Sequence, residues 1–384
     1  MFDAAIIGAG LAGAVMACVL AQHGWDVVLL DRNVFPKHKV CGEFLSPESR
    51  QMLASLGLYS LVESLHPIEI KQVRLTAASG VSLELPLPGT ALGVSRFLLD
   101  DQLQQAAAVK GVKVLAGTPV LEMVPEQDGQ GYRLDIQEKG ERRSLRARTV
   151  IGAWGRNPQA GVQAHANRPR TEPHPQDAWI GVKAHFAAAG PERENRIDMY
   201  FFPGGYVGVS PVEGGRLNVA ALLSRRAFQA AGGSVPGAIA AAQQWQPALR
   251  SRLTACSLLS ETQAAVSPVR LTRQPAAWGD IAHIGDAAAV IPPLCGDGMA
   301  MALRTVELCA PWVNRYLKKT VTLNEWRRHY TEAVRQEFAG PLRWGSWVQL
   351  ASANAGAMSL LLRLGRFAPQ LAYRVVQATR LKPI

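Results

Sequence analysis

Two short, uninterrupted apolar runs open the chain, and a longer uncharged stretch separates them. Residues 4–7 and 27–30 consist only of Ala, Ile, Val and Leu, a pattern typical of strands buried on both faces of a sheet. The stretch from residue 11 to 22 carries no charge and has the length of one helix. This order predicts a parallel strand–helix–strand unit at the start of an α/β fold.

The pattern then changes several times before the middle of the chain. We expect a loop at 32–45, a helix at 47–58 and a helix at 98–110, with alternating strand patterns between about 68 and 87. Four further strand patterns are separated by glycine-containing turns and predict a meander; they cover residues 112–116, 121–125, 132–138 and 144–153.

The second half of the chain predicts another sheet and then helices. Residues 159–177 are rich in Pro, His, Asn and Arg and are expected to form a loop between domains. A strand-rich block follows at 180–223, a helical stretch at 235–253 and a short strand at 281–284, and the rest is expected to be helical. The chain is therefore predicted to leave its first sheet, build a second one and return, with an active site in the cleft between them.

Composition narrows the class of protein. The chain is 48% apolar, as in an ordinary globular protein, and its 384 residues are enough for two domains or for one large domain with an insertion. The five cysteines include no Cys-x-x-Cys pair, which favours a reduced, cytoplasmic protein without structural zinc; they are Cys18, Cys41, Cys256, Cys295 and Cys309. The histidines, among them His165, His174 and His185, show no metal-ligand spacing, so no metal site is expected.

Much of the net charge of +11 lies near the C-terminus. After Glu337 there is no acidic residue, and basic residues alternate with large apolar ones; the basic residues are Arg343, Arg363, Arg366, Arg374, Arg380 and Lys382. Such a tail is expected either to contact an anionic membrane surface or to pack as a terminal helix pair with a solvated basic face. Nucleic-acid binding is disfavoured, because no basic stretch is interleaved with stacking aromatic residues in a known module.

Glycines at the first strand–helix junction give the strongest chemical signal. The run Gly8-Ala9-Gly10-Leu11-Ala12-Gly13 follows the first strand, and Asp31 ends the second strand, eighteen positions after Gly13. Gly8 is expected to permit a tight turn, Gly10 to let a pyrophosphate approach the backbone, and Gly13 to let the helix pack on the strand. The helix N-terminus would face the phosphates and Asp31 the ribose hydroxyls. The sequence therefore predicts a dinucleotide site.

A second constellation lies late in the chain. Gly285-Asp286 ends a strand, where the carboxylate is placed for a sugar hydroxyl. Pro292 and Pro293 stiffen the following loop, and Gly296, Gly298 and Met299 lie at the start of a helix whose N-terminus can face a ring carbonyl or an anion.

These motifs, in this order, resemble the FAD-dependent oxidoreductases of the para-hydroxybenzoate hydroxylase superfamily. The resemblance implies a Rossmann-type FAD-binding domain with an inserted antiparallel substrate sheet and a helical C-terminus. It implies that Asp286 binds the ribityl chain, that residues 293–298 lie near the flavin N1–C2 edge and that Arg96 contacts the cofactor. The expected FAD-binding residues are Gly8, Gly10, Leu11, Ala12, Gly13, Asp31, Arg32, Cys41, Gly42, Arg96, Gly285, Asp286, Pro293, Gly296, Gly298 and Met299.

A narrower resemblance is carried by two segments. Residues 35–43, Phe-Pro-Lys-His-Lys-Val-Cys-Gly-Glu, are similar to a loop beside the flavin in the geranylgeranyl reductase-like branch, which also includes polyketide-associated flavoprotein monooxygenases. Residues 200–206 are similar to that branch's aromatic segment facing the substrate cavity. Trp154 stands where family hydroxylases carry an Asp that serves FAD and NAD(P)H, so the electron donor is either NAD(P)H or a separate flavin reductase. The Trp-x-Trp-x-Ile-Pro signature of tryptophan halogenases is absent, which disfavours halogenation.

No catalytic residue is fixed by the sequence, because flavin chemistry requires no protein nucleophile. The candidates are Cys41, Tyr200, Tyr206 and Cys295. The two thiols have a simpler interpretation as small buried apolar groups. Tyr200, Phe202 and Tyr206 alternate along a predicted strand and either line a pocket for an aromatic or polyenyl substrate or form the core of a sheet. Glu43 is a further candidate for an acid–base group, and Asp297 is expected to be a helix cap. His38, Lys37 and Lys39 either bind phosphate or substrate or form a solvated loop.

The domain boundaries follow from the predicted elements. Residues 1–66, 91–160 and 271–340 are assigned to the FAD-binding domain, 67–90 and 161–270 to the substrate sheet, and 341–384 to a C-terminal helical segment.

The main functional hypothesis is monooxygenation of an aromatic or polyketide-like small molecule in secondary metabolism. The alternatives are reduction of an isoprenoid or other C=C bond, and a non-catalytic, membrane-associated flavin-binding protein. The sequence leaves the substrate and the oligomeric state open.

Overall fold

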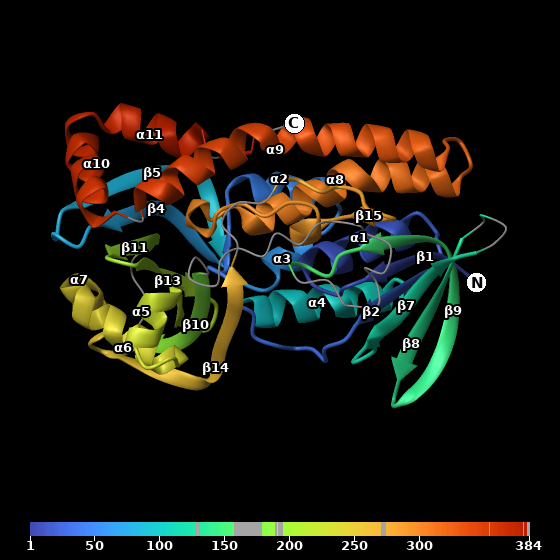
Figure 1. Ribbon diagram of the computed structural model, residues 1–384, viewed down its shortest axis with the longest axis horizontal. Coiled ribbons are helices and arrows are strands. Elements are labelled where there is room, and N and C mark those ends of the chain that lie inside the picture. Colours follow the sequence, from blue (N-terminus) through green and yellow to red (C-terminus); the bar gives the residue numbers. More distant parts are fainter. Residues whose placement is uncertain are drawn as a thin grey trace.

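Two sheets lie side by side, and long helices run along one flank of both (Figure 1). The computed structural model describes residues 1–126, 129, 131–156, 179–188, 190, 195–269, 274–352, 354–378 and 380–381. The loop expected at 159–177 lies outside the described residues.

The first sheet contains the predicted strand–helix–strand unit. Its order is β6(Lys113–Ala116), β2(Val27–Asp31), β1(Phe2–Ile7), β9(Glu141–Gly152), β8(Tyr132–Glu138) and β7(Val120–Pro125), with β15(Ala282–His283) on β9. Strands β1, β2, β6, β9 and β15 pair in parallel, and β7, β8 and β9 pair in antiparallel.

Helix α1(Leu11–Gln22) is buried along nearly its whole length between the sheet and the helices α4(Arg96–Val109) and α8(Gly298–Leu317). Ten consecutive residues, from Leu11 to Leu20, are buried. This burial explains why α1 carries no charge, because every one of its faces lacks water.

The second sheet has the order β14(Cys256–Val269), β10(Trp179–Ala188), β13(Arg216–Ser224), β12(Gly205–Val212), β11(Arg196–Phe202), β4(Ile68–Thr76), β5(Ser82–Gly93) and β3(Phe44–Leu45). All of its pairs are antiparallel except that of β4 with β11. Strands β3 to β5 come from the early part of the chain, so two segments far apart in sequence build this sheet.

Helices cover both sheets. Three short helices, α5(Arg225–Ala230), α6(Val235–Trp245) and α7(Pro247–Leu253), lie against one face of the second sheet. Helix α9(Leu323–Ser352) runs along the flank, and α10(Ala355–Phe367) and α11(Pro369–Ala378) lie at the end over β4 and β5 (Figure 1). No helix in the described part of the chain is long and apolar enough to cross a bilayer.

Three expectations from the pattern are corrected. The segment 112–116 is not part of the meander, because β6 pairs in parallel with β2 after the crossover through α4. The helix expected at 47–58 is two helices, α2(Glu48–Ser55) and α3(Tyr59–Glu63), since Gly57 adopts a left-handed φ of +70° that ends the first. Strand β14 was not predicted. Its buried and exposed positions do not alternate regularly, so its sequence lacks the two-residue period by which a half-buried strand is recognised.

Candidate active site at the contact of the two sheets

The glycine turn between β1 and α1 leaves no room for side chains at two positions. Gly8 has a φ of +115°, and a Cβ there would overlap the Ala153 carbonyl group. A Cβ on Gly13 would overlap the Gly8 carbonyl oxygen. Helix α1 therefore approaches β1 closely, and its first N–H groups, which have no intrahelical partners, point out of the turn.

Two cations face Gly10, the middle glycine of this turn. A Cβ on Gly10 would lie 3.1 Å from Lys39 Nζ and 3.6 Å from Arg96 Nη2. Both cations are held by the fully buried Asp100, which accepts from Lys39 Nζ, Arg96 Nε and Arg96 Nη2 at 2.8 Å each. A helix N-terminus with two fixed cations beside a bare backbone is a cradle for a pyrophosphate.

Asp31 lies at the end of β2, next to the same turn. Its Oδ2 accepts the Ala9 N–H at 2.9 Å, and its Oδ1 accepts the backbone N–H and the side-chain amide of Asn33 at 2.8 Å each. The carboxylate is thus fixed beside the glycine turn, where a ribose would lie. Arg32 is exposed.

The second predicted motif meets the first one through a glycine. Gly285 has a φ of +63°, and a Cβ there would lie 2.9 Å from Ala12 Cβ of α1. The Gly285 N–H donates to Thr305 Oγ1 of α8 at 2.8 Å, which fixes the turn η3(Gly285–Ala287). Asp286 is half-buried and accepts from Arg156 Nε at 3.0 Å. The structure therefore brings Asp286 beside the start of α1, as the FAD assignment requires.

The loop before α8 includes the turn η4(Pro293–Cys295) and reverses at Gly296, whose φ is +74°. Met299 is buried in the first turn of α8. At Gly298 and at Gly42 a Cβ would meet nothing within 4 Å, so space is open beside both backbones. Together with the cradle at Gly10, this space fits FAD: Lys39 and Arg96 would hold the pyrophosphate, Asp31 and Asp286 the sugar hydroxyls, and the loops at 41–43 and 293–298 would adjoin the ring.

Polar side chains of the second sheet hold the loop at 41–43. Ser210 Oγ of β12 donates to the Gly42 carbonyl at 2.7 Å, and Asn218 Nδ2 of β13 donates to the Cys41 carbonyl at 3.0 Å. Burial raises the pKa of the Cys41 thiol, against the effect of the nearby Arg96 guanidinium. Cys41 is therefore a neutral thiol near neutral pH.

A fully buried charge network lies directly behind this loop. Glu43, in the left-handed region with a φ of +53°, accepts from Lys183 Nζ at 2.8 Å and from the Arg96 N–H at 3.0 Å through Oε1. Its Oε2 lies 2.6 Å from His185 Nε2. Lys183 Nζ also lies 3.2 Å from His38 Nδ1. Glu43, Lys183 and His185 have no exposed surface.

The network fixes the charge of its members. Burial alone would raise the pKa of Glu43, but His185 and Lys183 hold that pKa below its ordinary value. Burial and the Lys183 charge lower the pKa of His38 to about 4, so this imidazole is neutral near neutral pH. Glu43 and Lys183 thus form an ion pair that ties the loop to the middle of the second sheet. This network was not predicted from the sequence, which suggested other roles for His38 and Glu43 and none for Lys183.

The predicted catalytic candidates do not share one face. Tyr206 of β12 pairs with Phe201 of β11, whereas Tyr200 pairs with Val207. Tyr200 and Phe202 therefore point to the opposite face, where they join the core under α6. Of the three, only Tyr206 faces the loop at 293–298 before α8, which we call the flavin loop. The single aromatic pocket lined by all three residues, which the alternation allowed, does not form.

Tyr206 is 5% exposed, and among the described residues its hydroxyl has no hydrogen-bond partner. Burial raises its pKa, with a further contribution from the nearby Cys295. Burial also raises the pKa of Cys295 to about 12, so both groups keep their protons near neutral pH. An unpaired buried hydroxyl is costly, which is typical of a group that acts on a ligand.

Trp154 folds back over the end of β9. A Cβ on Gly152 would overlap its ring, and its ring centroid lies 5.1 Å from that of His283. The side chain thus fills the position expected to carry an Asp and offers no carboxylate there.

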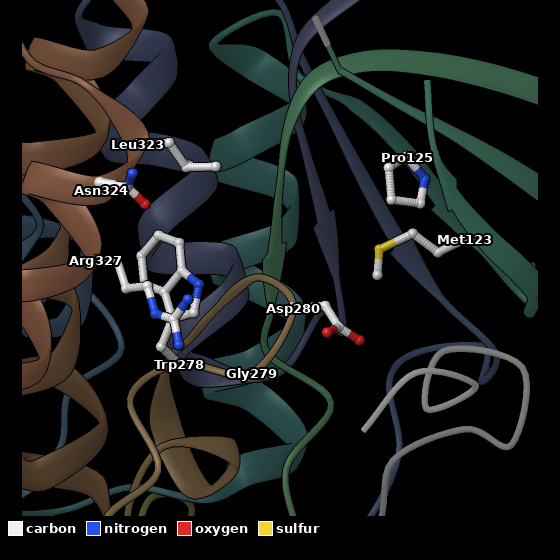
Figure 2. Close-up of a pocket in the computed structure, with 8 residues that line it drawn as sticks. All are labelled: Met123, Pro125, Trp278, Gly279, Asp280, Leu323, Asn324 and Arg327. Atoms are coloured by element: carbon white, nitrogen blue, oxygen red, sulfur yellow. The ribbon is translucent and has the colours of Figure 1, made fainter. Parts of the chain in front are cut away.

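A hollow of about 280 Å³ lies elsewhere, beside β7 and the start of α9. Figure 2 shows Met123 and Pro125 on one side of it and Trp278 and Arg327 on the other, with Asp280 between them. None of the residues assigned above to FAD lines this hollow, so it is separate from the candidate active site.

A cradle suited to a pyrophosphate, two carboxylates placed for sugar hydroxyls and open space at two glycines fit an FAD-dependent oxidoreductase. The chain belongs to the FAD binding domain family, whose model matches residues 1–310.

Named relatives agree with this class. The chain is 28% identical over 328 residues to a menaquinone reductase of Mycolicibacterium smegmatis, covering 80% of this chain and 75% of the relative. It is 26% identical over 360 residues to digeranylgeranylglycerophospholipid reductase 2 of Methanopyrus kandleri, covering 89% and 84%. The fold matches that of the myxobacterial chondrochloren halogenase with a TM-score of 0.79 at 18% identity, covering 99% of this chain and 90% of that one.

Proposed function

We propose that the protein uses FAD to reduce a carbon–carbon double bond in an isoprenoid-type chain. The observation that carries this proposal is the similarity, over 80% and 89% of the chain, to two proteins named as reductases of menaquinone and of a digeranylgeranyl lipid. Monooxygenation of an aromatic or polyketide-like compound, the main hypothesis from the sequence, has no comparable support. A halogenase at 18% identity shares the fold and carries no argument about the reaction.

When bound and reduced, FAD supplies a hydride to one carbon of the double bond. The other carbon needs a proton, and we assign its donation to Tyr206. The hydroxyl of Tyr206 is buried, keeps its proton and is free of any partner in the described residues. It lies on the face of the second sheet that is turned toward the flavin loop, with Cys295 and Arg156 near it. Among the described residues no protein acceptor competes for this proton, and the phenolate left by its donation regains a proton from water after the product leaves.

The surroundings of Tyr206 suit a hydrocarbon. Tyr206 belongs to a buried cluster whose other members are apolar, including Met199, Phe201 and Leu222, and Leu294 of the flavin loop packs against it. Such a wall excludes water from a reacting double bond and favours an alkene over a charged metabolite.

We propose that a separate flavin reductase or another reduced carrier, and not NAD(P)H bound at residue 154, reduces the flavin. Trp154 supports this proposal, because an indole that packs over Gly152 stands at the sequence position where a carboxylate is expected to serve both cofactors. NADPH alone is then expected to reduce the bound flavin far more slowly than dithionite does.

Product analysis tests the reaction. The FAD-loaded protein, reduced with dithionite under nitrogen, is mixed with a polyprenyl quinone whose ring has been reduced beforehand, and the side chain of the lipid is analysed by mass spectrometry. The proposal predicts that the lipid gains two hydrogen atoms for each double bond that is reduced. In heavy water both added atoms are deuterium, because dithionite supplies only electrons and both hydrogens come from solvent. With Tyr206→Phe, we expect hydrogenation to slow by about 10²–10⁴-fold while FAD stays bound. A parallel reaction under ¹⁸O₂ that incorporates ¹⁸O into the lipid, while the reaction under nitrogen yields no hydrogenated lipid, would overturn it.

A further inference from the structure

Exposed apolar side chains gather on one small part of the molecule. Within the described residues, eleven large hydrophobic side chains are exposed, and seven of them lie between residues 344 and 371. These seven are Trp344, Trp347, Leu360, Leu361, Leu364, Phe367 and Leu371. They come from the end of α9, from α10 and from α11, which pack against one another (Figure 1). We call these seven residues the docking face.

Helix α10 is apolar on both sides. Met358 and Leu362 point inward and are 5% and 3% exposed, in the cluster that contains Leu83 and Leu85 of β5. On the outer side, Leu364 is 55% and Phe367 is 89% exposed. The inner apolar side is enough to pack α10 on the sheet. The outer side of a surface helix normally carries polar residues, so its leucines and phenylalanine are not explained by this packing. The outer side is left for a partner that is itself apolar.

The charge around the docking face has one sign. Arg343, Arg363 and Arg374 are exposed on the same three helices, and no acidic residue follows Glu337. Arg366 donates to the Ser82 carbonyl at 2.6 Å and so sits at the edge of β5. The acidic residue of β5, Glu84, is paired with Arg74. The partner is therefore expected to be negatively charged as well as apolar.

We propose that the docking face binds the surface of a bilayer containing anionic phospholipids. Leucines and a phenylalanine enter the acyl boundary, tryptophans lie at the level of the headgroups, and arginines contact lipid phosphates. This combination matches helices that lie in the interface plane, and none of these helices is long and apolar enough to cross it in the described residues.

The docking face lies over the apolar cluster of the candidate site. The buried residues of α10, Met358 and Leu362, belong to the same cluster as Tyr206 and Phe201. The proposed membrane contact is therefore on the side of the molecule where a lipid substrate would reach Tyr206. The docking itself does not depend on the proposed reaction, and its test does not use turnover.

Vesicle co-sedimentation tests the proposal on the full-length protein loaded with FAD. We expect binding to phosphatidylglycerol-containing vesicles, much weaker binding to pure phosphatidylcholine vesicles, and loss of binding as salt rises. Phe367→Asp is expected to weaken binding by at least about tenfold. Val109→Asp is the matched control, because Val109 is also 89% exposed but ends α4, away from these helices. Circular dichroism and bound FAD confirm that both variants are folded.

Charge is tested in the same assay. Arg363→Gln is expected to weaken binding to anionic vesicles roughly fivefold. Arg142→Gln, an exposed arginine on β9 at the opposite end of the molecule, is expected to leave it unchanged (Figure 1).

Fluorescence shows which side chains enter the bilayer. Brominated phospholipids should quench part of the tryptophan emission, and Trp347→Phe should remove most of that quenching. Equal binding by Phe367→Asp and Val109→Asp would overturn the proposal. So would a protein that ignores vesicles but forms a dimer that Phe367→Asp dissociates, since the face would then bind a second copy.

Discussion

At Lys183 a full positive charge lies in the middle of a strand with no exposed surface. Its ammonium group is held by Glu43 at 2.8 Å, and Glu43 in turn is held by His185 and the Arg96 backbone. Removing one partner of a buried ion pair leaves the other charge without compensation, which costs more than the pair itself contributes.

We therefore expect Lys183→Met to lower the free energy of unfolding by about 3–5 kcal/mol. Chemical denaturation near neutral pH measures this change. The double variant Lys183→Met with Glu43→Gln removes both charges and should recover part of the loss. If the single variant is as stable as the original protein, the ion pair does not exist.

Substitution of Arg96 is expected to weaken FAD binding. Its guanidinium is fixed against Gly10 by Asp100, in the cradle assigned to the pyrophosphate. Arg96→Gln is expected to weaken FAD binding by about 10–100-fold, the value of a hydrogen bond to a charged group. Fluorescence titration of the apoprotein with FAD measures it. Arg50→Gln, which alters a partly exposed arginine on α2 that donates to Tyr59, should leave the affinity unchanged.

Among single residues, the sequence predicted those marked by their near neighbours in the chain and missed contacts between residues far apart in the chain. The glycines, Asp31 and Asp286 could be placed near one another because each lies within a few residues of a recognisable strand end, and their part in binding FAD stays a prediction. Glu43 and Lys183 are 140 positions apart, and no spacing relates them. A signal was nevertheless present: Lys183 and His185 are polar residues two apart in an otherwise apolar strand, so they share one face of it.

Helix α1 is the element on which the site depends most. It must approach β1 closely for its N-terminus to reach the phosphates, and Gly13 makes that approach possible. Gly13→Ala places a methyl group against the Gly8 carbonyl, so we expect a loss of about 1–3 kcal/mol of stability and of FAD affinity.

A matched control exists within α9. Gly340 is also helical, and a Cβ there would meet nothing within 4 Å. Gly340→Ala should stabilise the protein by about 0.5–1 kcal/mol, because alanine favours a helix over glycine. If both variants shift the thermal midpoint in the same direction, the close approach at Gly13 is not as described.

Elements were predicted well where one period dominates the pattern. The buried strands β1 and β2 and the helices α4 and α8 are long or uniform enough to be read directly. The pairing of β6 with β2 could not be read, because strand order is decided by the crossover through α4 and not by the residues of β6. Tyr200 and Tyr206 lie on opposite faces of the second sheet. This could not be predicted either, because it depends on the register of the β11–β12 hairpin.

At the scale of the whole molecule, the end of the chain returns to the flavin loop. Arg380 Nη1 donates to Asp297 Oδ1 at 2.5 Å, at the start of α8, and its guanidinium lies over the Phe44 ring. Asp297 was expected to be a helix cap, but no cap hydrogen bond forms; it is instead a buried partner of the C-terminal segment.

Burial raises the pKa of Asp297 to about 7, against the opposing effect of Arg380, and the nearby Glu48 raises it further. In the unfolded chain this carboxyl releases its proton near its ordinary value of 3.8. Because the folded state then holds the proton more tightly, the stability contributed by this group falls as the pH rises from about 4 to about 7. Asp297→Asn should remove that part of the pH dependence, which denaturation at pH 5, 6, 7 and 8 would show; parallel profiles would contradict it.

The reaction remains the central claim, and anaerobic flavin reoxidation tests it most directly. The FAD-loaded protein is reduced under nitrogen and mixed with a polyprenyl quinone whose quinone ring has been reduced beforehand, so that only its double bonds can accept a hydride. The account predicts that the oxidised flavin spectrum returns in the absence of oxygen and that Tyr206→Phe slows the return. A flavin that stays reduced until air is admitted would contradict it.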